Sequence, residues 1–95
     1  MLPLEQVYQQ ILEMTDGNPY KIENVKDYKL KLAMKYTDDV KLGCLKYFAQ
    51  KNYIEKLPKN NDYTFGETDS FSVTAQGITA WNDWFNEKSP KPSFY

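Results

Sequence analysis

Apolar residues at helical spacing open the chain and predict a helix over residues 4–15. One face of this helix is formed by Leu4, Val7, Ile11 and Met14. Pro3 fits at the start, because the first helical N–H needs no intrahelical partner. Gly17 readily adopts the left-handed backbone that ends a helix, and Pro19 cannot continue one. The helix is therefore expected to end near Thr15.

The segment from Tyr20 to Tyr36 fits two patterns. From 28 to 36, apolar or aromatic residues at every second position alternate with lysines and Ala33, which is typical of a strand with one solvated face. Helical spacing is met instead by Ile22, Val25, Tyr28, Leu32 and Tyr36. We favour a helix over roughly 25–34, because Leu, Ala, Met and Lys prefer helices and Asn24 is a suitable N-cap. A strand over 28–36 is the alternative.

A further helix is predicted from Thr37 to about Lys51. Thr37 is a good N-cap, and Asp38 and Asp39 lie in the first turn, where the helix dipole favours negative charge. The buried face is expected to hold Val40, Cys44, Leu45 and Phe48. Asn52 tolerates the left-handed conformation needed to leave the helix.

The last third of the chain predicts a hairpin followed by a helix. Residues 53–57 and 70–73 have strand patterns, and the segment between them, rich in Pro, Asn, Asp and Gly, predicts a long loop. Thr74 caps a helix over about 75–87, which carries Ile78, Trp81, Trp84 and Phe85. The prolines after residue 88 are incompatible with a helix. We thus expect one domain over 1–88 and a flexible tail over 89–95.

The amino-acid composition excludes several kinds of metal site and catalytic site. The 95 residues include no His and one Cys, so neither a typical zinc site nor a Ser–His or Cys–His pair can be built. We expect no enzyme activity, metal or cofactor. A single Cys forms no internal disulfide, which favours a reducing compartment and a cytoplasmic location. The sequence predicts no signal peptide and no membrane-spanning segment. The high aromatic share of 16% is expected to supply the core.

Charge is unevenly distributed although the net charge is −1. Residues 21–59 hold ten lysines and five acids, whereas residues 1–20 and 60–95 are each acidic. A basic middle segment is a mild indication of a surface facing a polyanion. All twelve basic residues are lysines, so reading of guanine by arginine is excluded.

The order of these elements resembles the winged helix-turn-helix family. The resemblance rests on three stretches: Val25, Leu30, Met34 and Tyr36-Thr37; residues 45–54; and residues 71–78. They look like the second helix with its turn, the end of the recognition helix leading into the first wing strand, and the return strand leading into a capped fourth helix. The resemblance implies an α+β fold with a three-helix core, an antiparallel wing of two to three strands and a C-terminal fourth helix.

The resemblance further implies a small DNA-binding protein, a transcriptional regulator of bacterial or phage type, whose partner is double-stranded DNA. The helix that begins after Thr37 would enter the major groove. The candidate DNA-binding residues are Lys29, Lys31, Lys35, Thr37, Lys41, Lys46, Gln50, Lys56 and Lys59. The lysines would hold phosphates, and Gln50 could read adenine edges.

Two features support an alternative, a protein–protein interaction module with the same fold. Asp38 and Asp39 would repel phosphates at the start of the recognition helix. The wing loop carries Lys59 against Asp62, Glu67 and Asp69, whereas a wing that grips DNA is expected to be basic. Large aromatic residues are natural interface anchors, so we expect a homodimer contact through Trp81, Trp84 and Phe85.

Overall fold

The computed structural model describes residues 4–32, 36–59 and 62–88, with side chains as far as residue 83. Within these residues the chain is an α+β domain with four helices and one three-stranded sheet. The helices are α1 (Leu4–Thr15), α2 (Val25–Lys31), α3 (Asp38–Gln50) and α4 (Ala75–Lys88). The strands are β1 (Glu23–Asn24), β2 (Ile54–Leu57) and β3 (Ser70–Val73). The expected tail over 89–95 lies outside the described residues.

Local side-chain chemistry sets the ends of the helices as predicted. The Asn24 side chain accepts a hydrogen bond of 2.8 Å from the backbone N–H of Asp27, and Thr37 Oγ1 accepts one of 3.3 Å from that of Val40. Both bonds satisfy N–H groups that have no partner within the helix. Gly17 and Asn52 leave α1 and α3 with φ of 62° and 63°.

Residues 25–31 form a helix, so the strand alternative is wrong for the described part of the ambiguous segment. Tyr28 is buried, whereas Leu30 is 65% exposed. A strand would place these two side chains on the same face, but a helix separates them by about 200°. The predicted helix extends to residue 34, and residues 33–35 lie outside the described part of the chain.

The sheet has β3 at its centre, antiparallel to both neighbours in the order β1-β3-β2. Glu23 pairs with Phe71, and Ile54 pairs with Val73. Both predicted hairpin strands are confirmed: β2 begins one residue later than predicted, and β3 has the predicted bounds. β1 was not predicted, because a strand of two residues has no measurable period.

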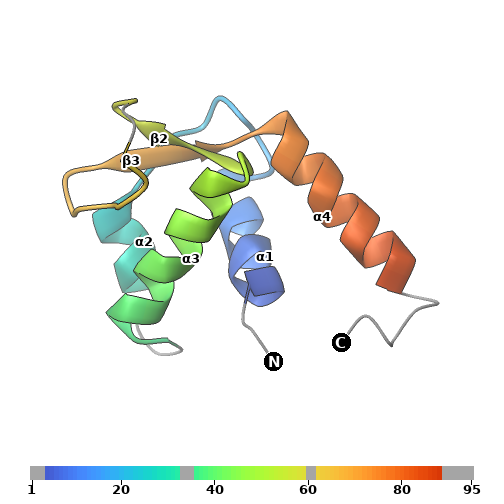
Figure 1. The fold of residues 1–95 in the computed structure, drawn as a ribbon, viewed down its shortest axis with the longest axis horizontal. Helices are drawn as coiled ribbons and strands as arrows, with labels where there is room; N and C mark the ends of the chain where they lie inside the picture. The colour runs from blue at the N-terminus through green and yellow to red at the C-terminus, as the bar shows by residue number, and fades with distance from the viewer. Residues whose placement is uncertain (1–3, 33–35, 60–61, 89–95) are drawn as a thin grey trace.

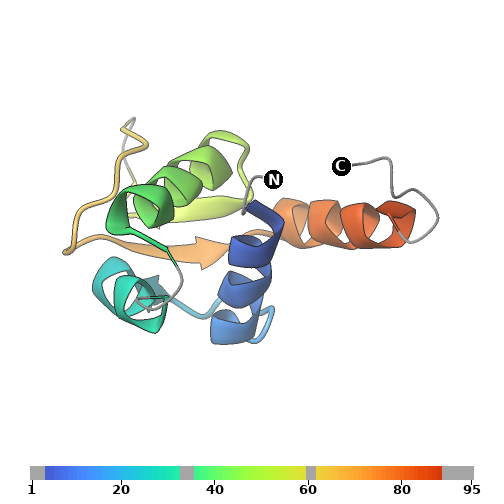
Figure 2. The ribbon, with the colours of Figure 1, turned by 90° about the horizontal axis from the view of Figure 1, so that it is seen from below.

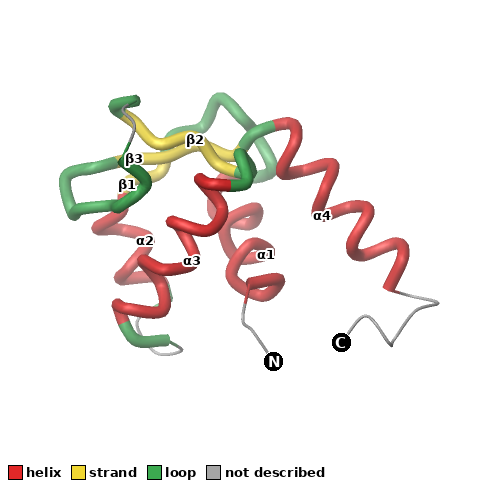
Figure 3. The backbone as a smooth tube through the Cα atoms, viewed as in Figure 1, coloured by secondary structure: helices red, strands yellow, loops and turns green. Residues whose placement is uncertain are grey.

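Figure 1 shows the sheet lying across one end of α1, α2 and α3, and Figure 2 shows α3 on one side of it and α1 with α2 on the other. α4 leaves this body on the side opposite the β2–β3 loop (residues 58–69), as both views show. The backbone trace in Figure 3 shows β1, β3 and β2 side by side above the helices. The β2–β3 loop therefore lies next to α3 and far from α4.

Aromatic side chains supply a large part of the core, as composition predicted: five of the thirteen buried hydrophobic residues in the described part of the chain are Tyr or Phe. Tyr8 packs edge-on against Phe48 with ring centroids 5.0 Å apart, and Tyr28 packs edge-on against Phe71 at 5.6 Å. Such pairs contribute about 0.5–1.5 kcal/mol beyond the area they bury. Val40 was expected in this core but is 38% exposed. That expectation is wrong because α3 turns Lys41 inward in its place.

Three parts of the chain meet at one close contact: helix α1, the residue that precedes β2, and helix α4. The Tyr8 hydroxyl donates a hydrogen bond of 2.9 Å to the carbonyl oxygen of Tyr53. Gly77 lies against the same two residues, and a Cβ at this position would overlap both of them. The closeness of α4 to Tyr53 therefore depends on glycine.

Cys44 is a buried core residue with 4% of its surface exposed, and burial raises the pKa of its thiol to about 11. Because the thiolate is the reactive form, we expect the folded protein to resist labelling by an aromatic disulfide reagent at mildly alkaline pH. Denaturant should release the reaction, and absorbance of the liberated thiol measures both rates. Equal rates in the folded and denatured protein would contradict this packing.

None of the helices in the described part of the chain combines the length and the apolar character needed to span a membrane.

Candidate nucleic-acid interface

α3 presents an outward stripe to solvent. Asp39, Gly43, Lys46 and Gln50 follow one another at intervals of three or four residues, and all four are exposed. The opposite face of α3 packs into the core. This stripe is the surface of α3 that an elongated ligand can reach, and it contains two of the predicted site residues, Lys46 and Gln50.

Lys46 is the central cation of the outward stripe. It forms no ion pair within 4.0 Å of a carboxylate among the described residues. The nearby carboxyl group of Asp62 has a lowered pKa, chiefly because it accepts a hydrogen bond from the Thr64 backbone, with smaller contributions from Lys56 and Lys46. The Lys46 ammonium is thus available to an external anion.

Lys41 does not lie on the outer face of α3, and that prediction is wrong. The residue is 2% exposed, and its ammonium donates a hydrogen bond of 2.8 Å to the carbonyl oxygen of Lys29. It also lies 3.0 Å from Asp38 Oδ1. Burial and these two partners together hold the charge inside the protein, where a DNA phosphate cannot reach it.

Lys29 lies beside this buried group and is largely engaged within the protein. Its ammonium lies 2.9 Å from Glu67 Oε2 and 3.5 Å from Asp38 Oδ2. The hydrogen bond to Glu67 is the main reason that the pKa of Lys29 is raised. The hydrogen bond from Lys41 is the main reason that the pKa of Asp38 is lowered. Two of the acids that argued against DNA binding, Asp38 and Glu67, are therefore paired with lysines, whereas Asp39 stays exposed on the outward stripe.

Lys31 and Thr37 have structural roles in the free protein. The Lys31 ammonium lies 2.6 Å from the buried carboxylate of Glu23 and joins the end of α2 to β1. Thr37 is exposed and uses its hydroxyl to cap α3. Lys35 lies outside the described residues.

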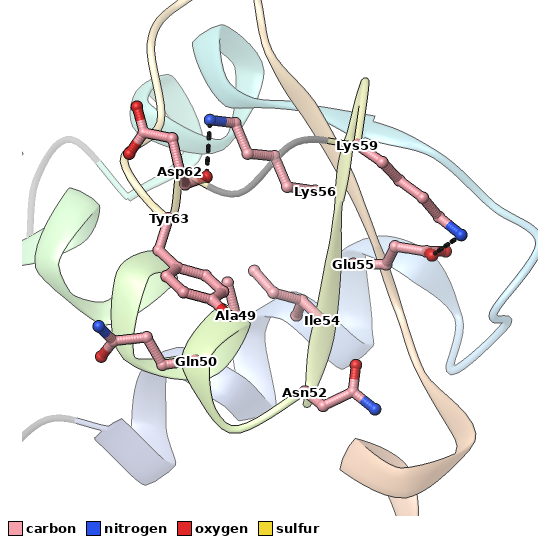
Figure 4. Close-up of a pocket in the computed structure, with 9 residues that line it drawn as sticks. All are labelled: Ala49, Gln50, Asn52, Ile54, Glu55, Lys56, Lys59, Asp62 and Tyr63. Carbon is pink, nitrogen blue, oxygen red and sulfur yellow. Dashed lines mark hydrogen bonds and ion pairs between the residues drawn. The ribbon is translucent and has the colours of Figure 1, made fainter.

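A groove of about 640 Å³ separates the end of α3 from the β2–β3 loop. It is lined by Ala49, Gln50, Asn52, Ile54, Glu55, Lys56, Lys59, Asp62 and Tyr63. Figure 4 shows the Tyr63 side chain pointing from the loop toward the end of α3. The groove thus brings together three predicted residues, Gln50, Lys56 and Lys59, with an aromatic ring.

The two lysines of this groove differ in availability. The Lys56 ammonium donates hydrogen bonds to the carbonyl oxygens of Asp62, at 3.1 Å, and Thr64, and it lies 5.5 Å from the centroid of the Phe65 ring. These contacts make Lys56 an anchor of the loop. The Lys59 side chain is 74% exposed and pairs with Glu55 at 2.7 Å, on the side away from Tyr63 in Figure 4.

Sequence reasoning missed Tyr63 and Lys26 as candidate contacts. Tyr63 is 44% exposed at the groove, and Lys26 is exposed on α2 with no ion pair to a described carboxylate. The presence of Tyr63 in a predicted polar loop was the available signal. Nothing in the pattern around Lys26 separated it from its neighbours.

The expected dimer contact through α4 is described only at Trp81. This residue is partly buried and packs against the core, so part of its surface is used within the protein. The side chains of Trp84 and Phe85 lie outside the described residues. The homodimer stays a prediction.

Comparison with protein-family models, with curated proteins and with solved structures gives no match. Among the described residues, no group of three or more acidic or cysteine side chains is arranged to hold a metal ion.

Proposed function

We propose that this chain is a small winged-helix protein that binds double-stranded DNA and acts as a transcriptional regulator of bacterial or phage type. The outward stripe of α3 would lie in the major groove, with Lys46 on a phosphate and Gln50 against a base edge. The β2–β3 loop would follow the neighbouring backbone as the wing. The observation that carries this proposal is the uncovered polar stripe of α3 beside a hairpin loop.

The order of helices and strands supports the proposal. Strands β2 and β3 follow α3, and the central strand β3 also pairs with β1, which precedes α2. This arrangement is compatible with a winged helix. In helix-turn-helix proteins the helix in the position of α3 lies in the major groove and contacts base edges. Gly43 leaves room in the middle of that face for close approach to DNA.

The number of free cations sets the expected strength of binding. Three lysines of this region are exposed and form no ion pair with a described carboxylate: Lys26 on α2, Lys46 on α3 and Lys51 at the C-cap of α3. Three phosphate contacts predict that the logarithm of the affinity falls with the logarithm of salt with a slope of about −3. We therefore expect weak binding with a shallow salt dependence.

Replacing Lys46 with glutamate tests the proposed docking face. The change removes a phosphate contact, so we expect about a tenfold loss of affinity and a reduction of the salt slope by about 1. Fluorescence anisotropy of a labelled random-sequence duplex, titrated at about 50 and about 200 mM salt, measures both quantities. The matched control is Lys21→Glu on the α1–β1 connection, which should lose far less affinity. Equal effects of the two changes would exclude the outward stripe of α3 as the docking face.

A protein–protein interaction module is the second candidate, and the internal pairing of lysines favours it. The ammonium groups of Lys29, Lys41 and Lys56 are paired with acceptors within the protein. Fewer cations are therefore available to phosphates. Under this alternative the α3–loop groove with its exposed Tyr63 would receive a partner. The wild-type protein would then leave duplex anisotropy unchanged even at about 50 mM salt.

A further inference from the structure

Glu67 joins the β2–β3 loop to α2 across a long separation in sequence. Its carboxylate lies 2.9 Å from the ammonium of Lys29, and the hydrogen bond between them is the main reason that the pKa of Glu67 is lowered. The Glu67 side chain is 64% exposed, whereas that of Lys29 is 18% exposed. An exposed acid therefore caps a cation that is otherwise well covered.

The Lys29–Glu67 pair borders a pocket of about 430 Å³ between α2, the start of α3 and the loop. Three ammonium-bearing residues line this pocket: Lys26, Lys29 and Lys41. Asp38 and Glu67 are the acids of its lining, so the pocket carries a net positive charge. Without Glu67 its positive charge would be larger by one.

The two acids of the pocket are held differently. Asp38 lies in the first turn of α3 and bridges Lys29 and Lys41, so it belongs to the internal packing of α2 against α3. Glu67 belongs to a turn in the loop and contacts Lys29 alone among the ion pairs of the described residues. Movement of this one loop side chain would uncover the Lys29 ammonium and leave the Asp38 bridges in place.

We propose that Glu67 is an internal substitute for a phosphate of the DNA backbone. In the free protein it occupies Lys29, and in the complex a backbone phosphate replaces it in the pocket bordered by Lys26 and Lys29. This inference rests on the proposed DNA-binding function. It adds a binding site for a phosphate of the DNA backbone, and it assigns to Glu67 the role of lowering the affinity for DNA. The contact would fix the register of the protein on DNA without reading sequence.

The reduction of DNA affinity by Glu67 is expected to be modest, because the Lys29–Glu67 pair is partly exposed. Pairs of this kind contribute little to stability, equivalent to a factor of about five at most in an equilibrium constant. A phosphate that displaces Glu67 also releases a condensed counterion from the DNA. The exchange is thus close to balanced, and removal of the Glu67 charge should shift it toward DNA.

The test is Glu67→Gln, which keeps the shape of the side chain and removes its charge. We expect duplex affinity to rise about threefold with little change in the salt slope, because a phosphate contacts Lys29 in both complexes. Glu13→Gln, an exposed position on α1, makes the same change in net charge away from the pocket and should raise affinity much less. Adding Lys29→Gln to Glu67→Gln should cancel the gain, whereas Lys29→Gln alone should have little effect.

The outcomes separate this inference from the proposed function. If wild type binds duplex and Glu67→Gln gains no more than Glu13→Gln, the substitute role of Glu67 is wrong while DNA binding stands. If Lys29→Gln fails to cancel the gain, Lys29 is not the group that Glu67 blocks, and the inference is overturned. If neither wild type nor Glu67→Gln binds at about 50 mM salt, the proposed function fails. Circular dichroism of each variant confirms that it is folded.

Discussion

Replacing Gly77 with alanine is expected to destabilise the domain by about 3 kcal/mol, the upper end of the usual range for overpacking. The added Cβ would overlap the Tyr8 hydroxyl and the Tyr53 carbonyl oxygen, and it would lie 2.8 Å from Tyr53 Cα. Two of these three atoms belong to the backbone, so rotation of a side chain cannot relieve the contact. The hydrogen bond from Tyr8 to Tyr53 would be strained by the same displacement. Urea denaturation measures the loss.

Gly43→Ala on α3 is the matched control and should have the opposite sign. No atom lies within 4 Å of a Cβ at this position, and its φ lies outside the left-handed region. Alanine there gains about 0.5–1 kcal/mol from helix propensity alone. If Gly77→Ala also stabilised the protein, the close approach of α4 to Tyr53 would be excluded.

Replacing Lys41 with glutamate is expected to cost about 3–5 kcal/mol, the range observed when one partner of a buried ion pair is removed. The side chain is 3% exposed, so the new carboxylate would be buried. It would face the Lys29 carbonyl oxygen, which loses its donor, and the carboxylate of Asp38. Since small domains are stable by about 5–15 kcal/mol, much of the protein could unfold, and thermal and urea unfolding measure how much.

Lys41→Met separates charge from packing at this site. Methionine keeps an unbranched apolar side chain and removes the hydrogen bond to the Lys29 carbonyl oxygen, so we expect a smaller loss of about 1–3 kcal/mol. Wild-type stability in Lys41→Glu would contradict the burial of this side chain. Any loss of DNA affinity in that variant has to be corrected for the unfolded fraction before it is assigned to the α3 surface.

The boundaries of the helices and of the β2–β3 hairpin were predictable because local chemistry sets them. Asn24 and Thr37 cap helices with side-chain oxygens, and Asn52 leaves α3 in the left-handed conformation. These effects depend on residues within about one helical turn. The pairing of β1 with β3 depends on residues far apart in sequence, which no local pattern contains.

The orientation of α3 was only partly predictable. Positions 41, 44, 45 and 48 have the spacing of a single buried face, but a lysine at 41 was assigned to solvent by its charge. Its long apolar stem fits the interior once Asp38 and the Lys29 carbonyl oxygen satisfy the ammonium. Val40 was placed in the core by its hydrophobicity, although the geometry of the helix turns it outward.

The candidate site was predictable in outline and not in its charges. Lys46 and Gln50 lie on the exposed face of α3 as the helical pattern predicted. The neutralisation of Lys29 by Glu67 could not be foreseen, because it depends on a contact between α2 and a loop 38 residues further along the chain. A count of charges along the sequence includes Lys29 as an available cation, whereas in the folded protein its ammonium is paired with a carboxylate.

The central strand of the sheet is also the last to be made by the ribosome. Before β3 emerges, the nascent chain carries α1, α2, α3 and β2, but Tyr28 lacks the ring of Phe71 and Ile54 lacks its pairing with Val73. Completion of the core therefore waits for residues 70–73. Polypeptides truncated before residue 70 are expected to remain open to proteases, so partial products of this chain would be short-lived.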